Sequence, residues 1–230
     1  MTANLGRILE FRLEPDGHRT VRIGCDPKAA PAPGRYLLAD LPADLDSLLA
    51  AALFSSLSFP DGFLAAPLDG PLPPAWELGA ELRLRGPLGR GFNLPPAVRN
   101  LALAAAGDTA ARLLPLVERA GSAALFTDLP VPDLPTRVEV QPLAALPEAL
   151  GWADFVAVDI PLGRVEDLGG ILGEPAALPV TLPAGQVLVH GPMPCGGLGE
   201  CGLCALPAGR RSILLCVEGP VCDLRLILQR

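Results

Sequence analysis

Apolar and polar residues alternate in short runs through the N-terminal part of the chain, which is the pattern of half-buried strands. Residues 7–13 alternate in this way, 14–17 read Glu-Pro-Asp-Gly and signal a turn, and 19–23 alternate again, so a hairpin is predicted. Further strands are predicted at 35–39, 53–59, 62–66 and 81–85, with a short helix at 42–53. Strands this short and this closely spaced predict a small antiparallel barrel over residues 1–95.

The pattern changes after residue 95, where apolar runs alternate with longer amphipathic stretches. Strands that alternate with helices indicate a parallel sheet built of βαβ units. The sequence therefore predicts an α/β unit over residues 96–190, with the proline-rich stretch 129–135 as a surface loop. The predicted strands are 101–105, 123–127, 137–140, 155–159 and 186–190, and the predicted helices are 108–120, 144–150 and 162–172.

The third part, residues 191–230, holds five of the six cysteines. Cys195, Cys201 and Cys204 are spaced C-x5-C-x2-C on a glycine-rich stretch, and Cys216 follows after eleven residues. A metal ion or an iron–sulfur cluster needs several thiolates around one point, and glycine lets the backbone curl around it without an intervening Cβ. The pattern therefore favours a cluster-binding segment.

Two other interpretations of the cysteines stay open. Plant-type [2Fe–2S] ferredoxins space their ligands C-x4-C-x2-C with a distant fourth cysteine, and this chain has one residue more in the first gap. A structural zinc with four thiolates more often uses two C-x2–4-C pairs, and only Cys201 and Cys204 form one here. Disulfides are the third interpretation. A [2Fe–2S] cluster is favoured over both.

Composition and charge narrow the functional classes. The net charge is −7 with no basic run, which argues against nucleic acid as a partner. The start of the chain lacks the basic and apolar segments of a secretory signal, and no apolar run reaches the roughly 18 residues of a membrane helix. We therefore expect a cytoplasmic protein that is not embedded in a membrane, and a reducing compartment favours metal binding over disulfides.

Three motifs give the chain a family resemblance. Residues 86–92 read GPLGRGF, residues 193–204 read MPCGGLGECGLC, and residues 216–221 read CVEGPV. In this order they resemble the GPLGxGF, M-x-C-G-x-G-x-C-x-x-C and C-x-D-G-P-V-F motifs of the electron-transfer subunit of type B dihydroorotate dehydrogenases. That family belongs to the ferredoxin-reductase-like flavoproteins, and its layout fits nearly the whole chain.

The resemblance implies a fold and a set of sites. The fold would be a barrel followed by a ferredoxin-reductase-like α/β unit and a cluster-binding loop, with a flavin between barrel and α/β unit. Cys222 would be a packing residue, because the family has Phe there. The implied cluster ligands are Cys195, Cys201, Cys204 and Cys216, and the implied flavin contacts are Gly86, Pro87, Leu88, Gly89 and Arg90.

The chain departs from that family at its nucleotide motifs. The family's Arg-Pro-x-Ser run is Ala-Leu-Phe-Ser-Ser at 52–56, which lacks the arginine that would make a charge-assisted contact to a flavin phosphate. The Gly-Gly-Gly turn is Ala-Ala-Ala-Gly at 104–107, followed by Asp108, and the Cys-Gly-Pro run is Asp-Ile-Pro at 159–161. Nicotinamide binding is therefore not expected, and binding of FAD is doubtful.

Four further residues receive structural interpretations. Asp159 is expected to cap a helix that begins at Leu162, and His190 to be a structural hydrogen-bonding residue. His18 is expected to be solvated in its turn, Cys25 to be a buried lone thiol, and no catalytic triad or phosphate-binding loop is found.

The sequence thus predicts an accessory electron-transfer subunit rather than a free-standing catalyst. Its [2Fe–2S] cluster would relay electrons to or from a catalytic flavoprotein such as dihydroorotate dehydrogenase of pyrimidine biosynthesis, in a hetero-oligomer. The alternative is a non-redox interaction subunit with decayed nucleotide sites, in which zinc or a vestigial metal site holds the C-terminal loop together.

Overall fold

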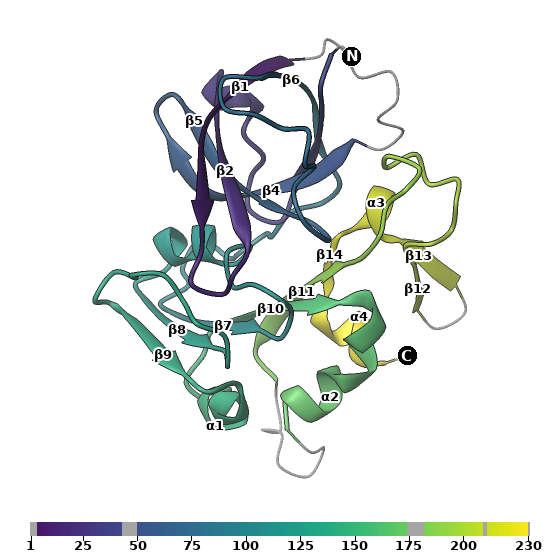
Figure 1. Cartoon of the computed structure of the whole chain (residues 1–230). Coiled ribbons are helices and arrows are strands. Elements are labelled where there is room, and N and C mark those ends of the chain that lie inside the picture. The colour runs from purple at the N-terminus through teal and green to yellow at the C-terminus, as the bar shows by residue number, and fades with distance from the viewer. Residues whose placement is uncertain (1–3, 43–49, 174–181, 209–210, 230) are drawn as a thin grey trace.

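The computed structural model describes residues 4–42, 50–173, 182–208 and 211–229. A barrel and a six-stranded sheet lie one beside the other, and the C-terminal segment runs along the side of both (Figure 1). Most of the helix predicted at 42–53 falls outside the described residues, and its last residues belong to a strand instead.

The N-terminal part is a closed barrel of antiparallel strands in the order β1-β2-β5-β4-β3-β6, as the alternation predicted. Its interior holds the apolar residues of alternate strand positions, among them Ile8, Ile23 and Phe63. The predicted turn at 14–17 is present, and Gly17 adopts a φ of 85° there. The strands are β1 Asn4–Leu13, β2 Arg19–Cys25, β3 Tyr36–Asp40, β4 Ala51–Phe59, β5 Gly62–Pro67 and β6 Glu81–Leu88.

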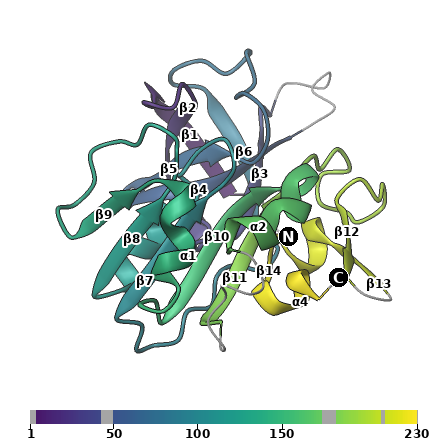
Figure 2. The ribbon, with the colours of Figure 1, turned by 90° about the horizontal axis from the view of Figure 1, so that it is seen from below.

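The second part is a six-stranded sheet in the order β14-β11-β10-β7-β8-β9 (Figure 2). The five strands from β7 to β11 are parallel, as predicted, and β14 joins the edge antiparallel to β11. The order reverses between β7 and β10, which makes this position the switch point of the sheet. The strands are β7 Asn100–Ala105, β8 Ser122–Phe126, β9 Val138–Gln141, β10 Phe155–Pro161, β11 Ala184–His190 and β14 Val221–Asp223.

The two faces of this sheet pack against different partners. Along β10, Phe155 and Ala157 face a core shared with the barrel residues Tyr36 and Phe54. The intervening Val156 and Val158 face a core that contains short helices and the cysteine segment. Both faces are therefore apolar, which explains why the parallel strands are nearly continuous hydrophobic runs.

The helices are short. The 3₁₀ helices are η1 Pro27–Ala29, η2 Leu114–Arg119, η3 Leu143–Ala145 and η4 Leu162–Asp167, and the α-helices are α1 Leu146–Ala149, α2 Leu168–Ile171, α3 Leu215–Glu218 and α4 Leu224–Leu228. Helical turns lie at 144–150 and 162–172, as predicted. No helix among the described residues is long and apolar enough to cross a membrane.

The continuous helix predicted at 108–120 is wrong. Residues 108–113 form turns, and only Leu114–Arg119 is helical, in a 3₁₀ conformation. Pro115 explains part of this, because proline lacks an N–H and disfavours helical conformation in the residue before it. Tertiary contacts explain the remaining loss of helix, because Arg112 is buried with charged partners instead of lying on an exposed helix face.

The C-terminal segment contains a hairpin that the sequence did not predict. Its strands are β12 Ala205–Ala208 and β13 Arg211–Leu214, which pair antiparallel. The chain then passes through α3, enters the sheet as β14 and ends in α4. The β12–β13 hairpin and α3 thus lie at the edge of the molecule, beside β14 (Figure 1).

Candidate metal centre and switch-point cluster

The loop from Cys195 to Cys204 is shaped by its glycines. Gly196, Gly197 and Gly199 all have left-handed φ values, between 61° and 78°. A Cβ on Gly197 would come within 2.7 Å of the Tyr36 hydroxyl, so a larger residue would not fit against the barrel. The extra residue between Cys195 and Cys201 is therefore accommodated in a tightly curled part of the loop.

The β12–β13 hairpin brings the fourth cysteine of the pattern to this loop. It begins directly after Cys204, and the pairing of Ala205 with Leu214 returns the chain to its starting point. The Leu215 N–H donates to the Cys204 carbonyl at 3.1 Å, which places Cys216 beside Cys204. The eleven-residue gap in the sequence is thus a hairpin that closes the cysteine set.

The four thiols lie near enough to one another to shift one another's pKa values. Backbone N–H groups of Glu200 and Cys201 point at the Cys195 sulfur and, helped by the Cys201 thiol, lower the pKa of Cys195 to about 6. Burial, and the contact with the Cys204 sulfur, raise the pKa of Cys216 to about 12. Cys201 is exposed, whereas Cys204 and Cys216 are buried. The charge of Cys195 also acts on Cys216, so the four thiols form one group that extends from the exposed Cys201 to the buried Cys204 and Cys216.

The four cysteines supply the donor chemistry that an iron–sulfur cluster needs. Within the described ranges, no three His, Cys, Asp or Glu side chains surround a single point at metal-binding distance. The four thiols form one group, and loop amides face the Cys195 sulfur. A [2Fe–2S] cluster takes four thiolates, and second-shell hydrogen bonds to the sulfurs tune it.

The remaining cysteines lie in other surroundings. Cys222 is buried in β14, where it pairs with Val187, and its pKa is raised to about 11 by burial. This placement agrees with the packing role predicted for it. Cys25 ends β2, and its thiol is half-buried rather than fully buried.

Tyr36 connects the cysteine segment to the barrel. Its hydroxyl donates to the Cys216 carbonyl at 2.8 Å, and its ring meets the Phe54 ring edge to face at 6.4 Å.

The predicted flavin contacts, residues 86–90, end at the C-terminal segment. The Arg90 N–H donates to the Gly219 carbonyl, and a Cβ on Gly89 would meet that carbonyl at 2.5 Å. Of the predicted flavin contacts, Leu88, Gly89 and Arg90 thus lie near the C-terminal segment, whereas Gly86 lies against Leu37 and the Pro87 carbonyl accepts from Arg35.

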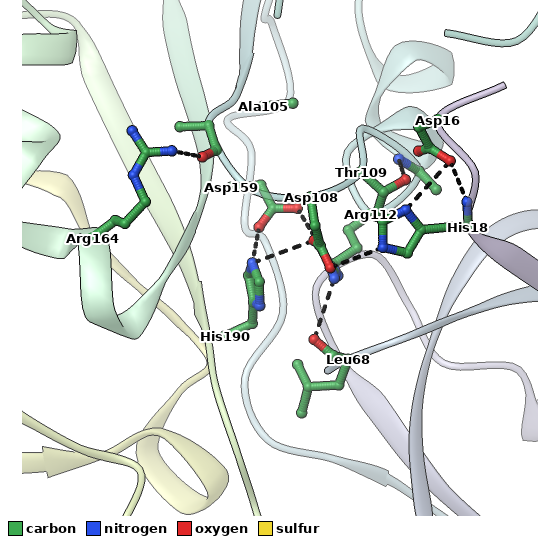
Figure 3. Close-up of polar contacts among 12 residues, drawn as sticks. Asp16, His18, Leu68, Ala105, Asp108, Thr109, Arg112, Asp159, Arg164 and His190 are labelled. Atoms are coloured by element: carbon green, nitrogen blue, oxygen red, sulfur yellow. Dashed lines mark hydrogen bonds and ion pairs between the residues drawn. The ribbon is translucent and has the colours of Figure 1, made fainter. Parts of the chain in front are cut away.

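The switch point of the sheet holds a cluster that the sequence did not reveal (Figure 3). The Arg112 guanidinium, which is fully buried, donates to Asp108 Oδ1 at 2.7 Å and to Asp159 Oδ2 at 3.1 Å. A third bond runs from Arg112 Nη2 to the Leu68 carbonyl of the barrel at 3.3 Å. His190 Nε2 lies 3.2 Å from Asp159 Oδ1. We call Asp108, Arg112, Asp159 and His190 the switch-point cluster.

The switch-point cluster corrects two predictions. Asp159 does not cap the helix after it; Pro161 occupies the cap position of η4, and the fully buried Asp159 carboxylate faces Arg112 and His190. His18 is not simply solvated, because its Nε2 lies 3.2 Å from Asp108 Oδ2. His190 was predicted to be a structural hydrogen-bonding residue; its Nε2 faces Asp159 at 3.2 Å but has no hydrogen-bond partner among the described residues. His18 therefore ties the turn of the β1–β2 hairpin to the sheet.

The electrostatics of the cluster favour its charged form. Burial alone would raise the pKa of Asp108, but the Arg112 hydrogen bond and charge, with His190, outweigh it and lower the pKa to about 2. Burial lowers the pKa of Arg112, and the two carboxylates more than offset this and raise it. The Ala106 N–H donates to the Asp159 carbonyl, so it is not free for an anion. The place where α/β sheets bind nucleotides is thus filled by the protein's own charges.

Solved structures assign the fold. The chain superposes with a TM-score of 0.67 on an NADH-dependent reduced ferredoxin–NADP oxidoreductase described in a study of flavin-based electron bifurcation, at 15% identity over 98% of this chain and 93% of that one. The TM-score is 0.55 with the ferredoxin reductase of carbazole 1,9a-dioxygenase, at 20% identity over 78% and 67% of the two chains. With phthalate dioxygenase reductase it is 0.53, at 11% identity over 81% and 68%.

This likeness shows that the chain has the ferredoxin-reductase-like fold, which confirms the predicted order of barrel and α/β sheet. No protein-family profile and no curated protein sequence matches the chain.

Proposed function

We propose that this chain is an accessory electron-transfer subunit that holds one [2Fe–2S] cluster on Cys195, Cys201, Cys204 and Cys216. The observation that carries the proposal is that the β12–β13 hairpin brings Cys216 back to Cys204, next to the curled glycine-rich loop that holds Cys195 and Cys201. Phthalate dioxygenase reductase, described as transferring electrons from pyridine nucleotides to [2Fe–2S], supports an electron-transfer role for this fold.

The residues around the thiols have defined tasks. A bound [2Fe–2S] cluster supplies transfer of single electrons. The N–H groups of Glu200 and Cys201 stabilise negative charge on sulfur, and hydrogen bonds of this kind set the reduction potential. Tyr36 anchors the Cys216 carbonyl and so fixes the buried Cys216 against the barrel.

The surface around the exposed Cys201 suits a docked partner. Cys201 is exposed, and Leu198, Leu203 and Val217 are exposed large apolar residues of the same segment. Apolar side chains grouped on a surface mark interaction sites. We propose that a catalytic flavoprotein of the dihydroorotate dehydrogenase kind docks there, in a hetero-oligomer, and that the substrate chemistry of pyrimidine biosynthesis belongs to that partner.

The switch-point cluster supports a relay rather than a pyridine-nucleotide reductase. A dinucleotide phosphate at the end of β7 would meet the Asp108 carboxylate, and the nearby Arg112 already has two carboxylate partners. FAD is not part of the proposal, because 52–56 lacks an arginine that could bind its diphosphate.

Chemical analysis tests the cluster. Anaerobically purified protein is expected to be red-brown and to contain about two irons and two acid-labile sulfides per chain. Protein expressed with iron in excess that instead contains stoichiometric zinc and no sulfide would overturn this proposal. That outcome would favour the alternative of a non-redox interaction subunit.

Reductants test the role in electron transfer. NADH alone is expected to leave the visible absorption of the isolated chain unchanged, because Asp108 and the Ala104–Ala106 turn occupy the nucleotide position. Addition of a dihydroorotate dehydrogenase catalytic flavoprotein with dihydroorotate is expected to bleach it. Rapid bleaching by NADH alone would contradict the assignment as a relay.

A further inference from the structure

The outer face of β6 carries two arginines that differ in their partners. Arg83 and Arg85 are two positions apart in the strand and both are exposed, so their side chains leave it on the same side. Arg83 donates to Asp40 Oδ1 at 2.8 Å, so its charge is matched by a carboxylate. Among the residues that the structure describes, no carboxylate forms an ion pair with Arg85, whose bond runs to a carbonyl instead. Arg85 therefore presents an unmatched positive charge on the barrel surface.

This unmatched charge lies at the loop that holds the proposed cluster ligands. Arg85 Nη2 donates to the Gly196 carbonyl at 3.4 Å, and a Cβ on Gly196 would come within 3.0 Å of the same nitrogen. Gly196 directly follows Cys195 and has a left-handed φ of 61°. The guanidinium thus contacts the backbone next to the first proposed ligand, at a position where only glycine leaves room for it.

The Tyr36 hydroxyl indicates that the charge of Arg85 reaches the deeper cysteines as well. This hydroxyl donates to the Cys216 carbonyl at 2.8 Å. Burial raises the pKa of Tyr36, and Arg85 acts in the opposite direction. The charges of three proposed ligands also raise it, namely Cys216, Cys204 and Cys195. One hydroxyl is therefore within electrostatic range of both the cysteine group and Arg85, which places the cation on the barrel side of that group.

We propose that Arg85 tunes electron transfer at the cysteine group: its positive charge stabilises the reduced state of the bound cluster and so raises the reduction potential. Uptake of one electron adds one negative charge at the four thiolates, and a cation that no carboxylate neutralises attracts that charge. Net charge is among the factors that set the potential of iron–sulfur clusters. Arg85 is not a ligand and acts through its charge. The inference rests on the proposed function and adds to it the residue that sets the direction of the potential shift.

Redox titration of the anaerobically purified full chain tests this role. Dithionite supplies the electrons, mediator dyes equilibrate them, and the visible absorption follows the fraction reduced. Arg85→Met and Arg85→Gln are each expected to shift the reduction equilibrium at least threefold toward the oxidised form, which is about 28 mV to lower potential for one electron. The difference from the wild type should shrink when the ionic strength rises from about 0.1 M to about 1 M, because the charge is exposed and salt screens it.

Two control variants separate the charge of Arg85 from its other contacts. Arg85→Lys keeps the charge and is expected to keep the wild-type potential. Arg83→Met removes a charge from the same face of the same strand, but Asp40 already matches that charge, so the shift should be less than half as large. Equal shifts for Arg85→Lys and Arg85→Met, or for Arg83→Met and Arg85→Met, would overturn the inference.

Iron and sulfide assays on the same samples distinguish the two proposals. Wild-type protein without iron and sulfide would overturn the proposed function, and the role of Arg85 with it. Full iron and sulfide in every variant, with a potential that Arg85→Met and Arg85→Gln leave unchanged, would overturn the role of Arg85 alone.

Discussion

Cys216→Ser is expected to remove the visible absorption of the anaerobically purified protein and to lower its bound iron to background. Cys216 is buried directly after the β12–β13 hairpin, where its thiol contacts Cys204. Its loss therefore removes one of the four proposed thiolate ligands. Because metal binding is coupled to folding, the C-terminal segment should also unfold more readily. Absorption spectra, iron assays and thermal melts measure these effects.

Cys222→Ser is the matched control, since both cysteines are buried in the same segment. Cys222 packs in β14 and pairs with Val187, so its replacement should keep the full absorption and cost about 1–2 kcal/mol of stability. If Cys222→Ser is colourless while Cys216→Ser keeps its colour, the assignment of the fourth ligand is wrong.

Arg112→Met is expected to lower the free energy of unfolding by about 3–5 kcal/mol, the cost of leaving a buried charge without its partner. The variant leaves the fully buried Asp159 carboxylate without its arginine. Arg83→Met is the control, because Arg83 and Asp40 form a partly exposed pair at 2.8 Å that contributes only about 0–1 kcal/mol. Urea denaturation measures both. Equal, small losses for the two variants would show that the switch-point cluster is not a structural element.

The pH dependence of the free energy of unfolding tests the same cluster independently, through the Asp108 carboxylate. Its pKa is lowered to about 2 in the folded protein, from an ordinary value of 3.8, so its ionised form stabilises the fold above pH 4. This contribution should be lost as the pH falls from about 4 through 2. His18 and His190 face the same carboxylate and only add attraction when protonated, so they do not cause a loss in this range.

The measurement is the difference in unfolding free energy between the wild type and Asp108→Asn from pH 5 to pH 2.5. The difference is expected to be largest at pH 5 and to shrink below pH 4. A difference that stays constant down to pH 2.5 would show that Asp108 has an ordinary pKa.

Much of this architecture can be predicted from the sequence because its signals are local. Alternation at 7–13 and 19–23 predicts the first hairpin, since successive strand side chains point to opposite faces. Apolar runs such as 155–159 predict strands buried on both faces. The cysteine spacing singles out Cys195, Cys201 and Cys204, because their loop is short and rich in glycine. Such features depend on neighbours along the chain.

The tertiary structure alone decided the switch-point cluster. Arg112 and Asp159 are 47 positions apart, and nothing near either residue shows that their side chains meet. The same holds for the contact of His18 with Asp108, which requires the barrel to lie against the sheet. The sequence thus determined which segments form strands and where thiolates gather. Only the packing of barrel on sheet decided which charges are buried together, because a buried charge is stable only where distant residues supply its partners.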